Sequence, residues 1–351
     1  MYNIVPSSWQ GSADQCMGEM AWLKQLGSNV YCALWQAWPK YDLPLGYDGY
    51  VISFHLESVD IEWLITQCHR LSVPVVVLSD SNYYDWPAPS NLKCLRYVYW
   101  HKQLRWMMDK FHIKSPKKIK YKASAFSNRI TQSKLLIFTA LMTYLQQENC
   151  YLSLGDWVEE RNIHHRQLTG RQTIDDLSKI FYDAYLGRKI QVDEFDPQIS
   201  NVPTFTADPW GPAYQQSALN FTNESYHYSY QGNFIRPGPF LTEKTLKCLL
   251  GGTGMVSVGQ FDTYSTLAKL GFKFDYEFDT SWDLLAGDLD RLTSIITLIK
   301  SFSNYSAEEI YLMTKMSSLH NQDHILSGDF AIECEKVNLS TSDQVIRYFK
   351  S

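Results

Sequence analysis

A Thr-Glu-Lys triplet at residues 242–244 places a carboxylate and an ammonium in the first turn of an expected helix. Thr242 suits the N-cap position, the following leucines recur at helical spacing, and Gly251 and Gly252 end the pattern. A cation in the first helical turn opposes the helix dipole by about 0.3–1 kcal/mol. Lys244 is therefore better explained if an anion binds at this helix end, and an ordinary surface lysine is the alternative.

The elements that must position this triplet alternate between strands and helices. In the first third of the chain, strands are expected at 3–5, 30–34, 50–55, 73–79 and 96–99, with helices at 13–26, 59–71 and 101–111. A second cycle has strands at 121–127, 151–154, 216–224 and 255–258, with helices at 131–147 and 242–251. Further helices are expected at 263–270, 284–301 and 307–318. Strands separated by helices predict parallel, doubly wound sheets and an α/β fold.

The length of 351 residues predicts two domains. A basic, proline-containing segment at 114–122 is the expected link, which divides the chain into an N-terminal Rossmann-like domain, 1–115, and a C-terminal one, 116–351. We expect the two domains to face a central cleft lined by the carboxyl ends of their strands, where open α/β sheets bind ligands.

Composition excludes several classes of protein. Apolar residues make up 45% of the chain and charged residues 20%, which is typical of a globular protein, and the net charge of −5 argues against nonspecific polyanion binding by the whole surface. Seven cysteines without a C-x-x-C pair predict reduced thiols. No signal peptide and no run of about 18 apolar residues is evident, so we expect a cytoplasmic protein.

Three segments resemble one family of enzymes. Ser127-Asn-Arg-Ile-Thr-Gln-Ser-Lys134 is similar to the strand-to-helix turn of the nucleotide-sugar-binding domain in GT-B glycosyltransferases, especially fucosyltransferase-like and exostosin-like enzymes and their phage relatives. Phe240-Leu-Thr-Glu-Lys-Thr-Leu-Lys247 resembles their Thr-Glu-Lys helix start, and 258–272 with 278–283 resembles the segment that closes that domain. The resemblance covers roughly residues 121 to 300 and implies a GT-B architecture with two Rossmann-like domains.

The resemblance also implies a donor site. By position, Glu243 would bond the ribose hydroxyls, Arg129 and Lys244 would stabilise the diphosphate, and Asn128 and Thr242 belong to the same motifs. Elementary chemistry agrees, because a departing diphosphate develops negative charge that preorganised cations stabilise without a metal. The implied reaction is hexosyl or pentosyl transfer from a nucleoside-diphosphate sugar, with UDP-sugars favoured. Retaining members of the family often carry a second glutamate, whereas position 251 in this chain is glycine. Retention and inversion of the anomeric configuration therefore both remain open.

Two patterns suggest metal binding and are interpreted otherwise. Asp288-Leu-Asp290 lies in a helical pattern, where acids two residues apart point to different faces. His320 and His324 have helical spacing without a third ligand nearby, and we interpret them as surface or capping residues.

A transferase also needs a general base for the acceptor hydroxyl. The candidates are His55, Glu57 and Asp80, which lie at or just after the ends of expected strands in the first domain. Each has a structural alternative, such as capping the helix that follows.

The acceptor is suggested by a local positive cluster in an otherwise acidic protein. Lys114, Lys117, Lys118, Lys120 and Lys122 would suit the phosphates of double-stranded DNA, and a solvated linker is the alternative. The resemblance to phage GT-B enzymes, some of which glycosylate hydroxymethylated pyrimidines, implies such a base in phage DNA as the leading acceptor, with a polysaccharide or lipid-linked sugar as the second. A non-catalytic nucleotide- or DNA-binding protein on the same scaffold remains the alternative of a different class.

Overall fold

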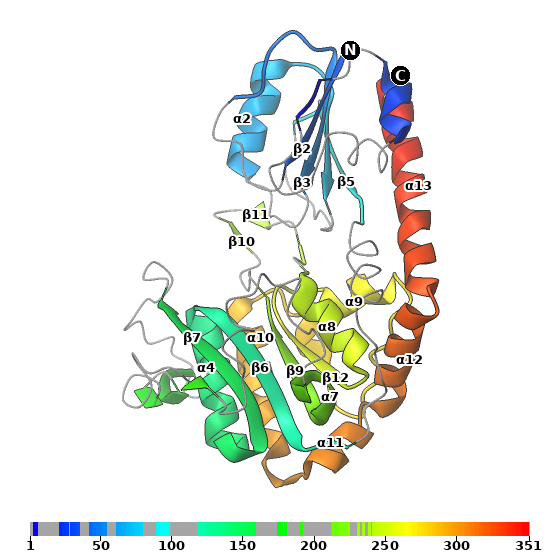
Figure 1. Cartoon of the computed structure of the whole chain (residues 1–351). Helices are drawn as coiled ribbons and strands as arrows, with labels where there is room; N and C mark the ends of the chain where they lie inside the picture. Colours follow the sequence, from blue (N-terminus) through cyan, green and yellow to red (C-terminus); the bar gives the residue numbers. More distant parts are fainter. Residues whose placement is uncertain are drawn as a thin grey trace. The chain divides into compact units, whose positions relative to one another are not determined.

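The chain forms two compact units, and each unit is built from separated segments of sequence (Figure 1). The computed structural model describes residues 3–5, 21–27, 29–35, 42–54, 61–79, 89–98, 118–158, 174–177, 179–180, 190–191, 212–224, 230–231, 234–235, 238–239 and 241–350. Unit 1 comprises Met1–Gln103, Tyr228–Leu241 and Phe330–Ser351, and unit 2 comprises Leu104–His227 and Thr242–Asp329. The expected boundary near residue 116 lies outside the described residues, and 228–241 and 330–351 join the first unit.

Unit 1 contains a five-stranded parallel sheet in sequential order. The strands are β1 (Asn3–Val5), β2 (Val30–Trp35), β3 (Gly49–Phe54), β4 (Val75–Ser79) and β5 (Leu92–Arg96), arranged β1-β2-β3-β4-β5. Every residue of β4 is buried, as its run of valines predicts. The expected strand at 96–99 was wrong by about four positions, because β5 is an edge strand whose charged residues Lys93 and Arg96 hide the apolar pattern.

Successive residues of these strands pack on opposite faces of the sheet. On one face, helix α2 (Ile61–Leu71) packs through Leu64 against Ile52 and Val77. On the other face, Val51 and Val76 form a core with Val345 of helix α13 (Asp329–Lys350) and with the 3-10 helix η1 (Ala21–Leu26). Figure 1 shows α2 and α13 on the two sides of this sheet.

Helix α13 was not predicted, and its attachment to unit 1 is specific. The Asn338 side chain accepts a hydrogen bond from Val98 N at 2.7 Å and donates one to Val98 O at 2.9 Å. Thr341 Oγ1 donates to Arg96 O at 2.6 Å. These bonds satisfy the backbone just beyond β5, so the C-terminal helix completes the first unit.

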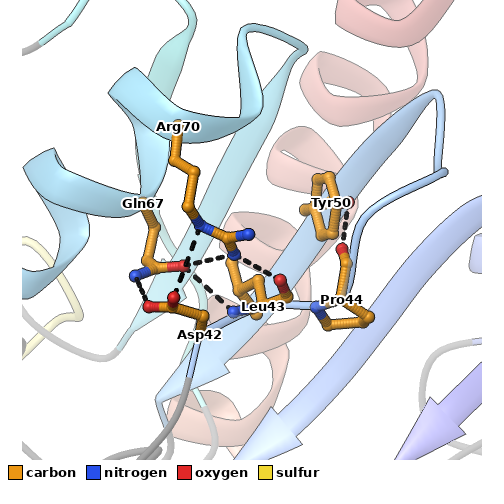
Figure 2. Close-up of polar contacts among 6 residues, drawn as sticks. All are labelled: Asp42, Leu43, Pro44, Tyr50, Gln67 and Arg70. Carbon is orange, nitrogen blue, oxygen red and sulfur yellow. Dashed lines mark hydrogen bonds and ion pairs between the residues drawn. The ribbon is translucent and has the colours of Figure 1, made fainter.

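A polar cluster ties the segment 42–44 to α2. Figure 2 shows the side chains of Gln67 and Arg70 pointing from the helix toward this segment. The side chain of Gln67 is fully buried, accepts a hydrogen bond from Leu43 N at 3.0 Å and donates one to Asp42 Oδ1 at 2.8 Å. The guanidinium of Arg70 donates to Gln67 Oε1 at 2.8 Å and to Leu43 O. The hydroxyl of Tyr50 donates to Pro44 O. The members satisfy one another, so this cluster is an anchor for a chain segment.

Unit 2 contains a second sheet, whose strand order reverses in the middle. The strands are β6 (Tyr121–Ile130), β7 (Cys150–Val158), β8 (Ile190–Gln191), β9 (Ser217–Asn223) and β12 (Gly254–Val258), arranged β12-β9-β6-β7-β8. All pairings are parallel except that of β7 with the short β8. The reversal between β6 and β9 is a topological switch point, the position at which open sheets of this kind bind ligands. The predicted α/β class, with two Rossmann-like domains, is confirmed.

Helices of unit 2 follow the predicted order with shifted ends. The expected helix at 131–147 is α4 (Gln132–Ala140), a π-helical turn η2 (Leu141–Leu145) and a 3-10 turn η3 (Gln147–Asn149). The remainder are α7 (Pro212–Gln216), α8 (Glu243–Gly251), α9 (Thr263–Ala268), η5 (Ser281–Leu284), α10 (Asp288–Ser301), η6 (Phe302–Asn304), α11 (Ala307–Leu312) and α12 (Lys315–Leu326). A short hairpin, β10 (Tyr230–Gln231) and β11 (Phe234–Ile235), belongs to unit 1. Within the described ranges, no helix has both the length and the apolarity of a bilayer span.

Candidate functional site

Glu224 joins the end of β9 to the beginning of α8. It directly follows the strand and is 2% exposed. Its carboxylate accepts hydrogen bonds from Thr242 N at 3.2 Å, Thr242 Oγ1 at 2.6 Å and Thr245 Oγ1 at 2.6 Å. The negative charge lies at the positive end of the helix dipole, where it is stabilised. The first turn of α8 is therefore held at the carboxyl end of β9, beside the switch point.

The start of α8 has the geometry that its sequence predicts. Thr242 is the N-cap, and its hydroxyl accepts from Lys244 N at 3.3 Å. The same oxygen accepts from Lys244 Nζ at 3.2 Å while it donates to Glu224. The Lys244 ammonium therefore folds back over the first turn, to the same Thr242 hydroxyl that bonds the Glu224 carboxylate. Gly252 ends the helix in the left-handed conformation at φ 69°, as predicted.

The end of β6 lies at the same edge of the second sheet. The backbone of Asn128 and Arg129 belongs to β6, just before Thr131, the N-cap residue of α4. Pairing of β6 with β7 shifts register between Ser127 and Arg129, which is an irregularity common next to functional sites. The Asn-Arg pair thus belongs to the last part of the strand, which runs to Ile130, three residues beyond the predicted end at 127, and not to a strand-to-helix turn. The side chains of Asn128, Arg129 and Glu243 lie outside the described part of the structure.

The segment after β12 is fixed by two buried charged residues that sequence reasoning missed. Asp283 accepts from Thr263 N at 3.0 Å and Tyr264 N at 2.7 Å at the start of α9. Burial raises the pKa of this carboxyl to about 7, although those two backbone bonds and the Arg291 charge lower it. Arg291 donates to Gly259 O at 3.0 Å and to Asp288 Oδ1 at 2.7 Å. In the sequence, the role of Arg291 is indicated only by its position on an otherwise apolar face of the expected helix.

The two patterns interpreted without a metal have structural partners. Asp288 and Asp290 lie in the first turn of α10, which confirms the helical interpretation. His320 Nε2 donates to Gly271 O at 3.1 Å and His324 Nε2 donates to Leu270 O at 2.7 Å, so both rings bond the backbone just after α9 and do not cap a helix. Among the described residues, no three His, Cys, Asp or Glu side chains form a group suited to a metal ion.

The candidate general bases follow two neighbouring strands of unit 1. β3 ends at Phe54 and β4 ends at Ser79, and these two residues are partners in the sheet register. His55, Glu57 and Asp80 come next in the sequence and lie outside the described residues. Their roles stay predictions.

The lysine cluster is described only in part. Lys118 and Lys120 are exposed, and Lys120 Nζ lies 4.8 Å from the centre of the Tyr121 ring. Lys122 donates to Ser303 O at 2.9 Å, which gives it a structural partner. Lys114 and Lys117 lie outside the described residues.

Comparison of the sequence with protein-family models and with curated proteins finds no match.

Proposed function

We propose that this chain is a GT-B glycosyltransferase that transfers a sugar from a nucleoside-diphosphate donor to a hydroxyl acceptor. One observation carries the proposal: Glu224 holds the Thr-Glu-Lys turn of α8 against the end of β9, beside the switch point of a Rossmann-like sheet. The Glu224 carboxylate already binds the N-terminus of this helix, so the proposal assigns the diphosphate to the cations at this edge, Lys244 and Arg129.

The proposed reaction places the leaving diphosphate at this edge. As the bond from the anomeric carbon to the phosphate oxygen breaks, negative charge develops on the diphosphate, and Lys244 with Arg129 is proposed to stabilise it. Glu243 is proposed to bond the ribose, with Asn128 and Thr242 in the same donor site. The acceptor hydroxyl gives its proton to a base of unit 1, for which His55, Glu57 and Asp80 are the candidates.

A hydroxymethylated pyrimidine in DNA is the proposed acceptor class. Exposure of Lys118 and Lys120 supports it, since exposed cations attract the phosphates of a duplex. Transfer to DNA containing hydroxymethylated pyrimidine, with the unmodified duplex as the control, tests the acceptor separately from the donor.

The first experiment is a thermal-shift screen with UDP, GDP, CMP and ADP. A nucleotide present at 100 times its dissociation constant should stabilise the protein by about 2.7 kcal/mol. A shift with one nucleotide identifies the sugar-nucleotide series for turnover assays. No shift with any of the four would contradict the proposed donor site.

The second experiment tests the leaving-group role. We expect Arg129→Ala and Lys244→Ala each to raise the activation free energy by about 2 kcal/mol or more, which lowers turnover roughly 30-fold. Lys273→Ala, which removes an exposed lysine elsewhere in unit 2, is the matched control and should leave turnover unchanged. Nucleotide binding without any sugar transfer would instead indicate the non-catalytic alternative.

A further inference from the structure

Asn223, the last residue of β9, carries a buried side-chain amide without a hydrogen-bond partner in the described part of the chain. The residue is 1% exposed, and neither its nitrogen nor its oxygen is bonded to any described residue. Asn220, earlier on the same strand, is fully engaged: it bonds Ser124 Oγ and donates to Tyr214 O at 3.1 Å and Thr253 Oγ1 at 2.6 Å. An unpaired buried amide is rare in folded proteins and requires a physical reason.

This amide lies where the neighbouring strands β6 and β9 stop pairing with each other. Register partners of β6 and β9 extend as far as Ala125 and Phe221, two residues before Asn223. On its other side β9 stays paired with β12 as far as Asn223 and Val258. The register shift of β6 between Ser127 and Arg129 occurs at the same level. Asn223 therefore lies where the two strands of the switch point separate.

We propose that Asn223 is a ligand-recognition residue, whose amide hydrogen-bonds a neutral group of the bound ligand that carries both a donor and an acceptor. The inference rests on the proposed function and extends it to the specificity of the donor site. A phosphate offers acceptors alone and would leave the amide oxygen unpaired, so the diphosphate is not the partner. A nucleobase edge and the hydroxyls of a sugar both have the required chemistry.

Burial of the amide restricts how a ligand reaches it. Both polar atoms are covered, so a ligand reaches them only by displacing neighbouring side chains. Ligand binding at Asn223 is therefore coupled to a local rearrangement at the end of β9.

The test uses Asn223→Leu, a substitution of similar size. Removal of an unpaired buried amide should leave the urea midpoint of the free protein unchanged or higher, because the cost of desolvating the amide disappears. Affinity for UDP and UDP-glucose, measured by calorimetry, should fall at least tenfold for one or both. Weaker binding of both ligands assigns the contact to the nucleobase, and weaker binding of UDP-glucose alone assigns it to the sugar. If another nucleotide gives the thermal shift, that nucleotide and its sugar conjugate replace this pair.

Asn220→Leu is the matched control on the same strand. It removes an amide with three partners, so its urea midpoint should fall. If Asn223→Leu lowers the midpoint equally and leaves both affinities unchanged, the amide has a structural role and the proposal is wrong. Asn223→Ala supplies the same comparison of affinities if the leucine variant does not fold. A wild-type protein that binds no nucleotide overturns the proposed function along with this inference, whereas wild-type binding with unchanged variant affinity overturns the inference alone.

Discussion

At the scale of single residues, Asp283 makes stability depend on pH in the neutral range. Burial raises its pKa in the folded protein to about 7, from an ordinary value of 3.8. The folded state therefore binds the proton more tightly than the unfolded state, so the free energy of unfolding falls as pH rises from about 4 to about 7. The slope from this group approaches about 1.4 kcal/mol per pH unit within that window.

Asp283→Asn tests this dependence. We expect the variant to lack the pH-dependent stabilisation that protonated Asp283 provides. The free energy of unfolding of the variant, relative to that of the wild type, should therefore increase as pH rises from about 4 to about 7. Urea unfolding at several pH values between 4 and 8 measures the difference, and Asp275→Asn, at an exposed position, is the control. A difference between wild type and Asp283→Asn that stays constant across the window would contradict the assignment.

At the scale of elements, the junction of β9 with α8 depends on bonds to the buried carboxylate of Glu224. Thr245→Val removes one of these donors, and a hydrogen bond to a charged group contributes about 1.5–3 kcal/mol. We expect the free energy of unfolding to fall by that amount in denaturant titrations, with weaker nucleotide binding if the turn holds the ligand.

Thr293→Val is the matched control for this junction. Its hydroxyl donates to Leu289 O at 2.7 Å on an exposed helix surface, where water replaces the bond, so the expected cost is small. Equal decreases in the free energy of unfolding for the two substitutions would show that the bond from Thr245 to Glu224 contributes no more than an ordinary hydroxyl bond on a helix surface.

Element prediction succeeded where local pattern and chain geometry agree. Thr242, Gly252 and the apolar spacing between them define α8 from its start to its end, because capping and periodicity are local properties. α10 begins four residues after the expected start at 284, since 281–284 form a separate 3-10 turn. α13 was missed because its buried face is narrow and includes polar residues such as Asn338, whose partner lies far away in the sequence.

At the scale of the whole molecule, unit 1 depends on the C-terminus of the chain. Asn338→Ala leaves the N–H and C=O of Val98 without their side-chain partner, at a cost of about 1–3 kcal/mol for each unsatisfied buried group. We expect faster amide hydrogen exchange in β4, β5 and α13, with no change in β9 and β12 of unit 2.

Ser340→Ala, at an exposed position of the same helix, is the control for this prediction and should leave exchange unchanged. Faster exchange in both units of Asn338→Ala would mean that the two units do not respond separately to the loss of the contact.

The sequence by itself determined the α/β class and the helix that starts at Thr242 and ends at Gly252. These features depend on periodicity, capping and turn chemistry within a few residues. The tertiary structure alone decided the strand order with its reversal between β6 and β9, and the return of α13 to unit 1. It also decided that Glu224 is bonded and that the Asn223 amide has no partner among the described residues. The physical reason is that strand order and hydrogen-bond satisfaction depend on partners distant in the chain, which no local pattern specifies.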